Sequence, residues 1–212
     1  MNKTLEHLLL EVNKIKDKIG KEVRKKLNEF KKNLLKDEDD IYLELCFCIL
    51  VANTSLNKTL EIWKNIKEDL LNDDCDSLVN KLKELGYRFY RVRAKYIIEA
   101  RKYKRKIKEL LGKINEKDLR EWLVKNVKGI GWKEASHFLR NMGYENFAIL
   151  DRHILRILKE YKIVEDIPKS LTKKRYLEIE EKLREIAEKL GISLAELDMY
   201  LFFMETGKIP ER

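Results

Sequence analysis

Residues 123–139 read LVKNVKGIGWKEASHFL, and this stretch decides how the whole chain is interpreted. Apolar residues keep a helical spacing on both sides of Gly129-Ile130-Gly131, which predicts a helix, a tight hairpin and a second helix. Two glycines let the backbone turn sharply and leave its amides open to a close approach by phosphate. The hairpin also leads into a helix N-terminus, where N–H groups without helical partners favour an anion. The glycine spacing alone is equally compatible with a plain connector between two helices.

Two charged residues near the hairpin are candidates for chemistry. Lys133 lies in the first turn of the second predicted helix, where a cation opposes the helix dipole. It is either a solvated surface lysine or an amine whose charged form is disfavoured, so that the neutral amine can attack carbon. Eighteen residues later, Asp151 follows an apolar run and precedes a new helical pattern, so it is predicted to be an N-cap. The intervening helix and a short loop could bring Asp151 back beside the hairpin.

The composition narrows the class of protein. The chain has 212 residues with 44% hydrophobic residues, which is enough for a sizeable core, and a formal net charge of +9, which favours a polyanion such as nucleic acid. No apolar run is long enough to span a membrane, and the N-terminus does not resemble a signal peptide, so we expect a cytoplasmic chain without a membrane partner. Cys46, Cys48 and Cys75 have no CxxC spacing, and no residues have metal-ligand spacing, so we expect neither a disulfide framework nor a metal site.

The periodicity predicts an all-α, two-lobed chain in which residues 1–212 form a single fold. Helices are expected at about 41–52, 57–71, 76–85, 88–102 and 172–190, with the helix–hairpin–helix at about 117–143. The most apolar helix, at about 41–52, is expected to be central. Gly20 is interpreted as a break between two N-terminal helices. The expected caps and stops are Thr54 or Ser55, Gly86, Gly191 and Ser193.

Several segments together resemble a known family. The hairpin segment 127–133, followed by 150–153, resembles the helix–hairpin–helix signature of the endonuclease III superfamily of DNA glycosylases. The similarity is closer to its archaeal-type branch of 8-oxoguanine DNA glycosylase/AP lyases. Further matching segments are 45–50, 86–91 with 93–94, 133–140 and 206–208. The resemblance runs from about Ile41 to the C-terminus. It implies no iron–sulfur cluster, because the cysteines that hold one in other members lie near the C-terminus and no cysteine follows Cys75.

The resemblance implies a mechanism. Lys133 would attack C1′ of the damaged nucleotide, displace the base and form a Schiff base, after which β-elimination would cut the strand on the 3′ side. Asp151 would stabilise the developing positive charge on the sugar or help to deprotonate Lys133. The hairpin would hold the DNA backbone through Lys128, Gly129, Ile130 and Gly131. Its carbonyls could also hold a monovalent cation, and no other cofactor is implied.

The resemblance also implies contacts to DNA and to the flipped base. Independently of the resemblance, the basic stretch 101–108 could form a phosphate-binding face with Arg88, Arg91 and Arg93, or it could be a solvated helix face. Asn53 would fill the space that the extruded base leaves, although it could equally be a helix cap. The C-terminal helix and tail, residues 193–212, would lie near the base pocket, with Asp198, Phe202 and Arg212 as pocket residues. Asp198 could instead be a helix-cap partner, and Phe202 could be core.

The sequence departs from the family pattern in that pocket. Phe202 stands where tryptophan is common, and the tail reads Ile209-Pro210-Glu211-Arg212 where the family has a terminal lysine. The expected function is a bifunctional glycosylase that excises 8-oxoguanine from double-stranded DNA and acts as a monomer. Two alternatives are a helix–hairpin–helix protein that binds DNA without catalysis and a helical protein–protein scaffold.

Overall fold

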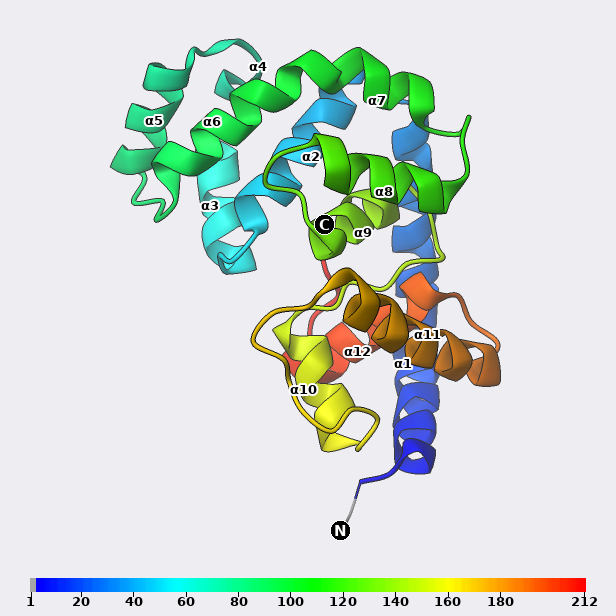
Figure 1. The fold of residues 1–212 in the computed structure, drawn as a ribbon. Coiled ribbons are helices and arrows are strands. Elements are labelled where there is room, and N and C mark those ends of the chain that lie inside the picture. Colours follow the sequence, from blue (N-terminus) through cyan, green and yellow to red (C-terminus); the bar gives the residue numbers. More distant parts are fainter. Residues whose placement is uncertain (1–2) are drawn as a thin grey trace. The chain divides into compact units, whose positions relative to one another are not determined.

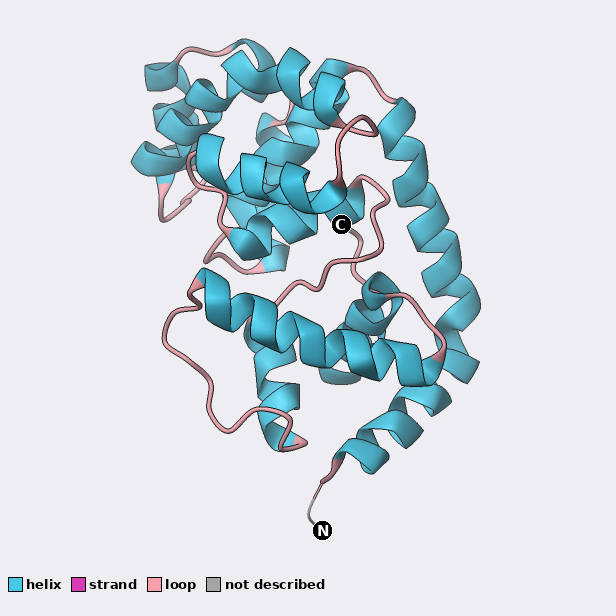
Figure 2. Ribbon diagram, turned by 45° about the vertical axis from the view of Figure 1, so that its right-hand side comes forward, coloured by secondary structure: helices cyan, strands magenta, loops and turns pink. Residues whose placement is uncertain are grey.

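The computed structural model describes residues 3–212, and within that range it contains helices and loops but no strand (Figure 2). The chain divides into two compact units. We call the first the terminal unit, which runs to Lys32 and resumes at Leu139–Arg212, and the second the central unit, Asn33–Phe138. The prediction of an all-α, two-lobed chain is confirmed.

The terminal unit is built around its last helix. Its helices are α1 (Leu5–Lys32), α10 (Arg152–Glu160), α11 (Lys173–Leu190) and α12 (Leu194–Thr206). α12 packs against each of the other three (Figure 1). Its residues from Leu194 to Leu201 are buried on nearly every side, apart from Glu196, as is typical of a helix surrounded by other elements.

Gly20 does not break a helix, because α1 continues without interruption from Leu5 to Lys32. A Cβ at Gly20 would lie 3.2 Å from the hydroxyl oxygen of Tyr200 on α12. The glycine therefore permits close contact between two helices, and the predicted break is wrong.

The central unit surrounds a buried helix. Its elements are η1 (Asn33–Leu35), α2 (Glu38–Val51), α3 (Leu56–Ile66), α4 (Asp69–Asn72), α5 (Cys75–Glu84), α6 (Tyr90–Ala100), η2 (Arg101–Tyr103), α7 (Lys104–Leu110), α8 (Glu116–Asn126) and the beginning of α9 (Trp132–Asn141). α2 contacts α3, α4, α6 and α7, and it is buried from Ile41 to Val51, so the expectation of a central apolar helix is confirmed. Cys46 and Cys48 are both fully buried in it.

Most predicted caps are present. The side chains of Ser55, Asp151 and Ser193 each accept a hydrogen bond from a backbone amide at the start of the following helix. Gly191 ends α11 in the left-handed conformation, with φ of 61°. None of the helices in the described range is long and apolar enough to cross a bilayer.

Candidate active site and nucleic-acid interface

The predicted hairpin joins α8 to α9 in the central unit. The Ile130 amide donates to the Val127 carbonyl at 3.2 Å, which closes the turn, and the Ala135 amide donates to the Gly131 carbonyl at 2.9 Å, which begins α9. Gly129 has φ of 85°, and a Cβ there would lie 2.5 Å from Cδ2 of Tyr96. Both the conformation and the close contact therefore require glycine at this position.

Lys133 occupies the first turn of α9, as predicted, and contacts an acid that the sequence analysis did not consider. The Lys133 ammonium lies 3.6 Å from Oε1 of Glu134, and the two side chains are 27% and 15% exposed. Oε2 of Glu134 accepts a hydrogen bond from the Gly131 amide at 3.2 Å. In this structure, one of the amides predicted to face a phosphate is therefore bonded to a carboxylate. A glutamate three residues after a helix N-cap is a known capping signal, which could have revealed this contact.

Arg93, which was expected to join Arg88 and Arg91 in a phosphate-binding face, does not lie on an exposed surface. Its guanidinium is buried and donates to the carbonyl of Ala52 at 3.1 Å. Its Nη1 lies 3.1 Å from the position of a Cβ at Gly129. Ala52 precedes Asn53, which is exposed and left-handed with φ of 59°. Arg93 therefore lies between two elements predicted to contact DNA, the hairpin and the turn at Asn53.

Asp151 lies in the terminal unit and is the N-cap of α10. Its Oδ1 accepts the amides of His153 at 2.8 Å and Ile154 at 3.0 Å. Oδ2 takes part in neither bond, so one carboxylate oxygen remains for other chemistry. Because Lys133 belongs to the central unit, the pairing of the two residues stays a prediction.

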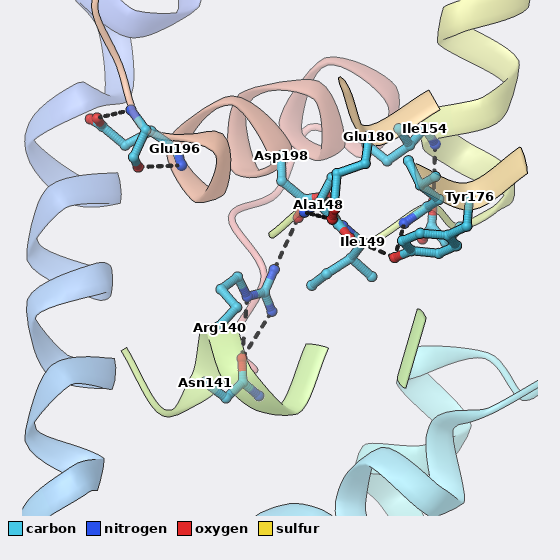
Figure 3. Close-up of polar contacts among 12 residues, drawn as sticks. Arg140, Asn141, Ala148, Ile149, Ile154, Tyr176, Glu180, Glu196 and Asp198 are labelled. Carbon is cyan, nitrogen blue, oxygen red and sulfur yellow. Dashed lines mark hydrogen bonds and ion pairs between the residues drawn. The ribbon is translucent and has the colours of Figure 1, made fainter. Parts of the chain in front are cut away.

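Asp198 is buried within the terminal unit, and its two oxygens have different partners (Figure 3). Oδ1 accepts the Ile149 amide at 3.0 Å, and Oδ2 lies 3.2 Å from Nη1 of Arg140. Its side chain is 5% exposed, and burial raises the pKa of Asp198 to about 7 although the Arg140 guanidinium opposes the rise. Asp198 therefore anchors the segment before Asp151, and its role at a base pocket stays a prediction.

The other predicted pocket residues are more accessible. Phe202 is half-buried, and its ring meets the His153 ring edge to face with centroids 5.9 Å apart. His153 and Arg156 both contact Oε1 of Glu205, at 3.5 and 3.3 Å. Phe202 is therefore not a fully buried core residue, and Arg212 is also half-buried. Their roles at a base pocket stay predictions.

The predicted phosphate contacts lie in the central unit. Arg88 and Arg91 are exposed and stack over the neighbouring rings of Phe89 and Tyr90. Lys128 is exposed and paired with Glu99 at 3.0 Å.

The basic stretch 101–108 is largely engaged within the unit. Arg101 donates to the Leu70 carbonyl, Lys104 pairs with Asp39, Arg105 pairs with Glu109, and Lys108 donates to the Leu34 carbonyl. These contacts favour a structural role for the stretch.

Comparison with known proteins gives consistent results. Residues 23–192 match the family model for 8-oxoguanine DNA glycosylase. The 8-oxoguanine DNA glycosylase/AP lyase of Methanocaldococcus jannaschii is 48% identical over 188 residues, 88% of this chain and 90% of that protein. The protein of that name from Thermotoga maritima is 42% identical, over 98% of this chain and 100% of its own. A solved structure of the M. jannaschii glycosylase/lyase, in complex with a 15mer DNA containing 8-oxoguanine, is 45% identical with a TM-score of 0.92 and covers 96% of this chain and 99% of that one.

Proposed function

The chain belongs to the 8-oxoguanine DNA glycosylase family, and from this premise we propose that Lys133 is the nucleophile with which it excises 8-oxoguanine and then cleaves the strand. The observation that carries the assignment is the position of Lys133. It lies in the first turn of α9, directly after the glycine hairpin, and its side chain is only 27% exposed. If the hairpin binds a phosphate of the DNA backbone, the sugar next to that phosphate comes within reach of the Lys133 amine.

The reaction follows from the chemistry of an amine and an N-glycoside. The neutral amine of Lys133 forms a bond to C1′ as the bond from C1′ to the base breaks, and the base leaves with a proton. The C1′–O4′ bond of the sugar then breaks as a second proton passes from the lysine nitrogen to O4′, which gives the Schiff base. In the β-elimination, C2′ loses a proton, a C2′–C3′ double bond forms, and the C3′–O bond breaks so that the 3′ phosphate leaves.

Asp151 supplies the fixed negative charge that this reaction needs. The sugar becomes positively charged as the base departs, and a preorganised carboxylate stabilises that charge. Oδ1 of Asp151 is held by two backbone amides, which fix its orientation. Oδ2 is the oxygen that we assign to the sugar or to a proton of Lys133.

The hairpin and the exposed arginines are proposed to bind the DNA backbone. The glycines, with Lys128 and Ile130, allow a phosphate to approach the start of α9, and Arg88 and Arg91 add charge. The carbonyls of Val127 and Gly131 each accept one backbone amide and keep a second lone pair, which fits a monovalent cation. The 15mer DNA containing 8-oxoguanine in the M. jannaschii complex supports a DNA partner, and a DNA substrate supports action inside the cell.

Borohydride trapping tests the assignment. The protein, incubated with a duplex containing 8-oxoguanine and borohydride, should form a covalent adduct, and Lys133→Gln should abolish the adduct while DNA binding is retained. Lys125→Gln is the matched control, because Lys125 is an exposed lysine on α8 and should still be trapped. An adduct of undiminished yield with Lys133→Gln would refute the assignment. Equal affinity for damaged and undamaged duplex, without base release, would favour the non-enzymatic alternative.

A further inference from the structure

The segment before Asp151, residues 147–150, is buried although it is neither helix nor strand. Phe147, Ala148, Ile149 and Leu150 are between 0% and 7% exposed. Buried amides and carbonyls require hydrogen-bond partners, because an unpaired one costs about 1–3 kcal/mol. This segment has no neighbouring strand to provide them.

Three side chains from α11 and α12 provide these partners instead (Figure 3). Glu180 Oε1 accepts the Ala148 amide at 3.1 Å, and Asp198 Oδ1 accepts the Ile149 amide at 3.0 Å. The Tyr176 hydroxyl donates to the Ala148 carbonyl at 2.6 Å and accepts the Leu150 amide at 3.4 Å. We call Tyr176, Glu180 and Asp198 the backbone clamp.

The clamp is itself held in place by charge. Asp198 is paired with Arg140 at 3.2 Å, and Arg140 also donates to Oδ1 of Asn141 at 3.1 Å. Glu180 lies 3.9 Å from Arg184. Buried carboxylates are costly unless they are paired and hydrogen-bonded, so their geometry is strongly determined.

The clamp is directly connected to the proposed catalytic carboxylate. The Asp151 amide donates to the Ile149 carbonyl at 2.7 Å, and the Ile149 amide is held by Asp198. The backbone of Asp151 is thus held through Ile149 by the clamp, and its side chain is held by the amides at the start of α10.

We propose that Tyr176, Glu180 and Asp198 are positioning residues that set the place of Asp151 for base excision. The inference rests on the proposed function, because it assumes that Asp151 acts on the sugar. A misplacement of about 1 Å can cost about 100-fold in rate, so a carboxylate on an irregular segment needs such support. Loss of one clamp bond should reduce the rate of excision by about 10- to 100-fold while DNA affinity changes little.

The test is a double-mutant cycle between the clamp and Asp151. Tyr176→Phe removes only the hydroxyl, and single-turnover excision of 8-oxoguanine at saturating enzyme should slow by about 10- to 100-fold. In an Asp151→Asn background, Tyr176→Phe should slow excision by less than about threefold, because the clamp acts through that carboxylate. A purely structural role would give the same factor in both backgrounds.

Tyr161→Phe is the matched control. Tyr161 is also buried in the terminal unit, and its hydroxyl donates to Glu11 at 2.5 Å, outside the clamp. It should lose a comparable amount of thermal stability but less than about threefold in excision rate. If Tyr176→Phe fails to fold, Glu180→Met and Glu180→Gln replace it. The glutamine keeps an acceptor for the Ala148 amide and should lose less rate than the methionine.

The outcomes separate the inference from the function on which it rests. Equal factors for Tyr176→Phe in both backgrounds, or an unchanged rate, would overturn the clamp alone, provided that Asp151→Asn itself slows excision to a low but measurable rate. Full excision by Asp151→Asn would instead overturn the proposed role of Asp151.

Discussion

Replacing Gly129 with alanine tests whether the hairpin depends on close contact with α6. The change forces an alanine to adopt φ of 85°, and this left-handed conformation costs about 1–2 kcal/mol of stability. It also places a Cβ 2.5 Å from Cδ2 of Tyr96, and such overpacking costs about 1–3 kcal/mol. The lower entropy of the unfolded chain offsets about 0.4–1 kcal/mol. We expect a loss of about 1–5 kcal/mol in the free energy of unfolding.

A matched control separates strain from contact. Gly86 has φ of 69°, and a Cβ there would meet no atom within 4 Å. Gly86→Ala should therefore share the conformational cost without the clash. The difference between the two variants, about 1–3 kcal/mol, should report the contact with Tyr96. Replacing Tyr96 with alanine in the Gly129→Ala background should recover part of it.

Urea unfolding measures the free energy of unfolding of each variant. Titration with duplex DNA at several salt concentrations measures its DNA affinity. Gly129→Ala should also weaken DNA binding, because a displaced hairpin no longer presents its amides to a phosphate, whereas Gly86→Ala should not. Equal unfolding free energies for the two alanine variants would refute the reasoning.

Two further predictions concern the terminal unit. Asp151→Ala should lose about 0.5–2 kcal/mol of stability together with the α10 cap, whereas Asp151→Asn should keep the cap. Both changes should slow excision strongly. Thermal unfolding and single-turnover rates measure the two effects, and equal destabilisation by both changes would contradict the prediction. Burial raises the pKa of Asp198 to about 7, so the folded state binds this proton more tightly than the unfolded chain does. Its contribution to stability should therefore be complete below about pH 4 and decrease as the pH rises through about 7. Urea unfolding at several pH values should show a flatter dependence for Asp198→Asn, and identical curves would contradict the prediction.

Features that depend on neighbours in sequence could be predicted. Ser55, Asp151 and Ser193 each bond an amide two or three residues ahead, so a short window contains the whole signal. The glycines of the hairpin were predicted for the same reason. Glu134 belonged to this class as well, since it reaches back only three residues to the Gly131 amide.

Features that depend on distant partners could not be predicted. Gly20 was interpreted as a break because its partner, Tyr200, lies on another helix far along the chain. The periodicity of α12 could not reveal that Asp198 bonds the Ile149 amide, because that contact depends on how an irregular segment packs. Arg93 had no local signal for its bond to the Ala52 carbonyl. In each case, tertiary packing decided the role of a residue whose local pattern suggested another one.

The burial of α2 has a consequence for redox chemistry. Cys46 and Cys48 are both 0% exposed, and burial raises the pKa of the Cys46 thiol to about 12. Peroxides and alkylating agents react with the thiolate, so a buried thiol held in its neutral form is protected from both. Cys75 is the partly exposed thiol and the expected first site of oxidation. The core of the central unit should therefore resist the same oxidants that convert guanine into 8-oxoguanine.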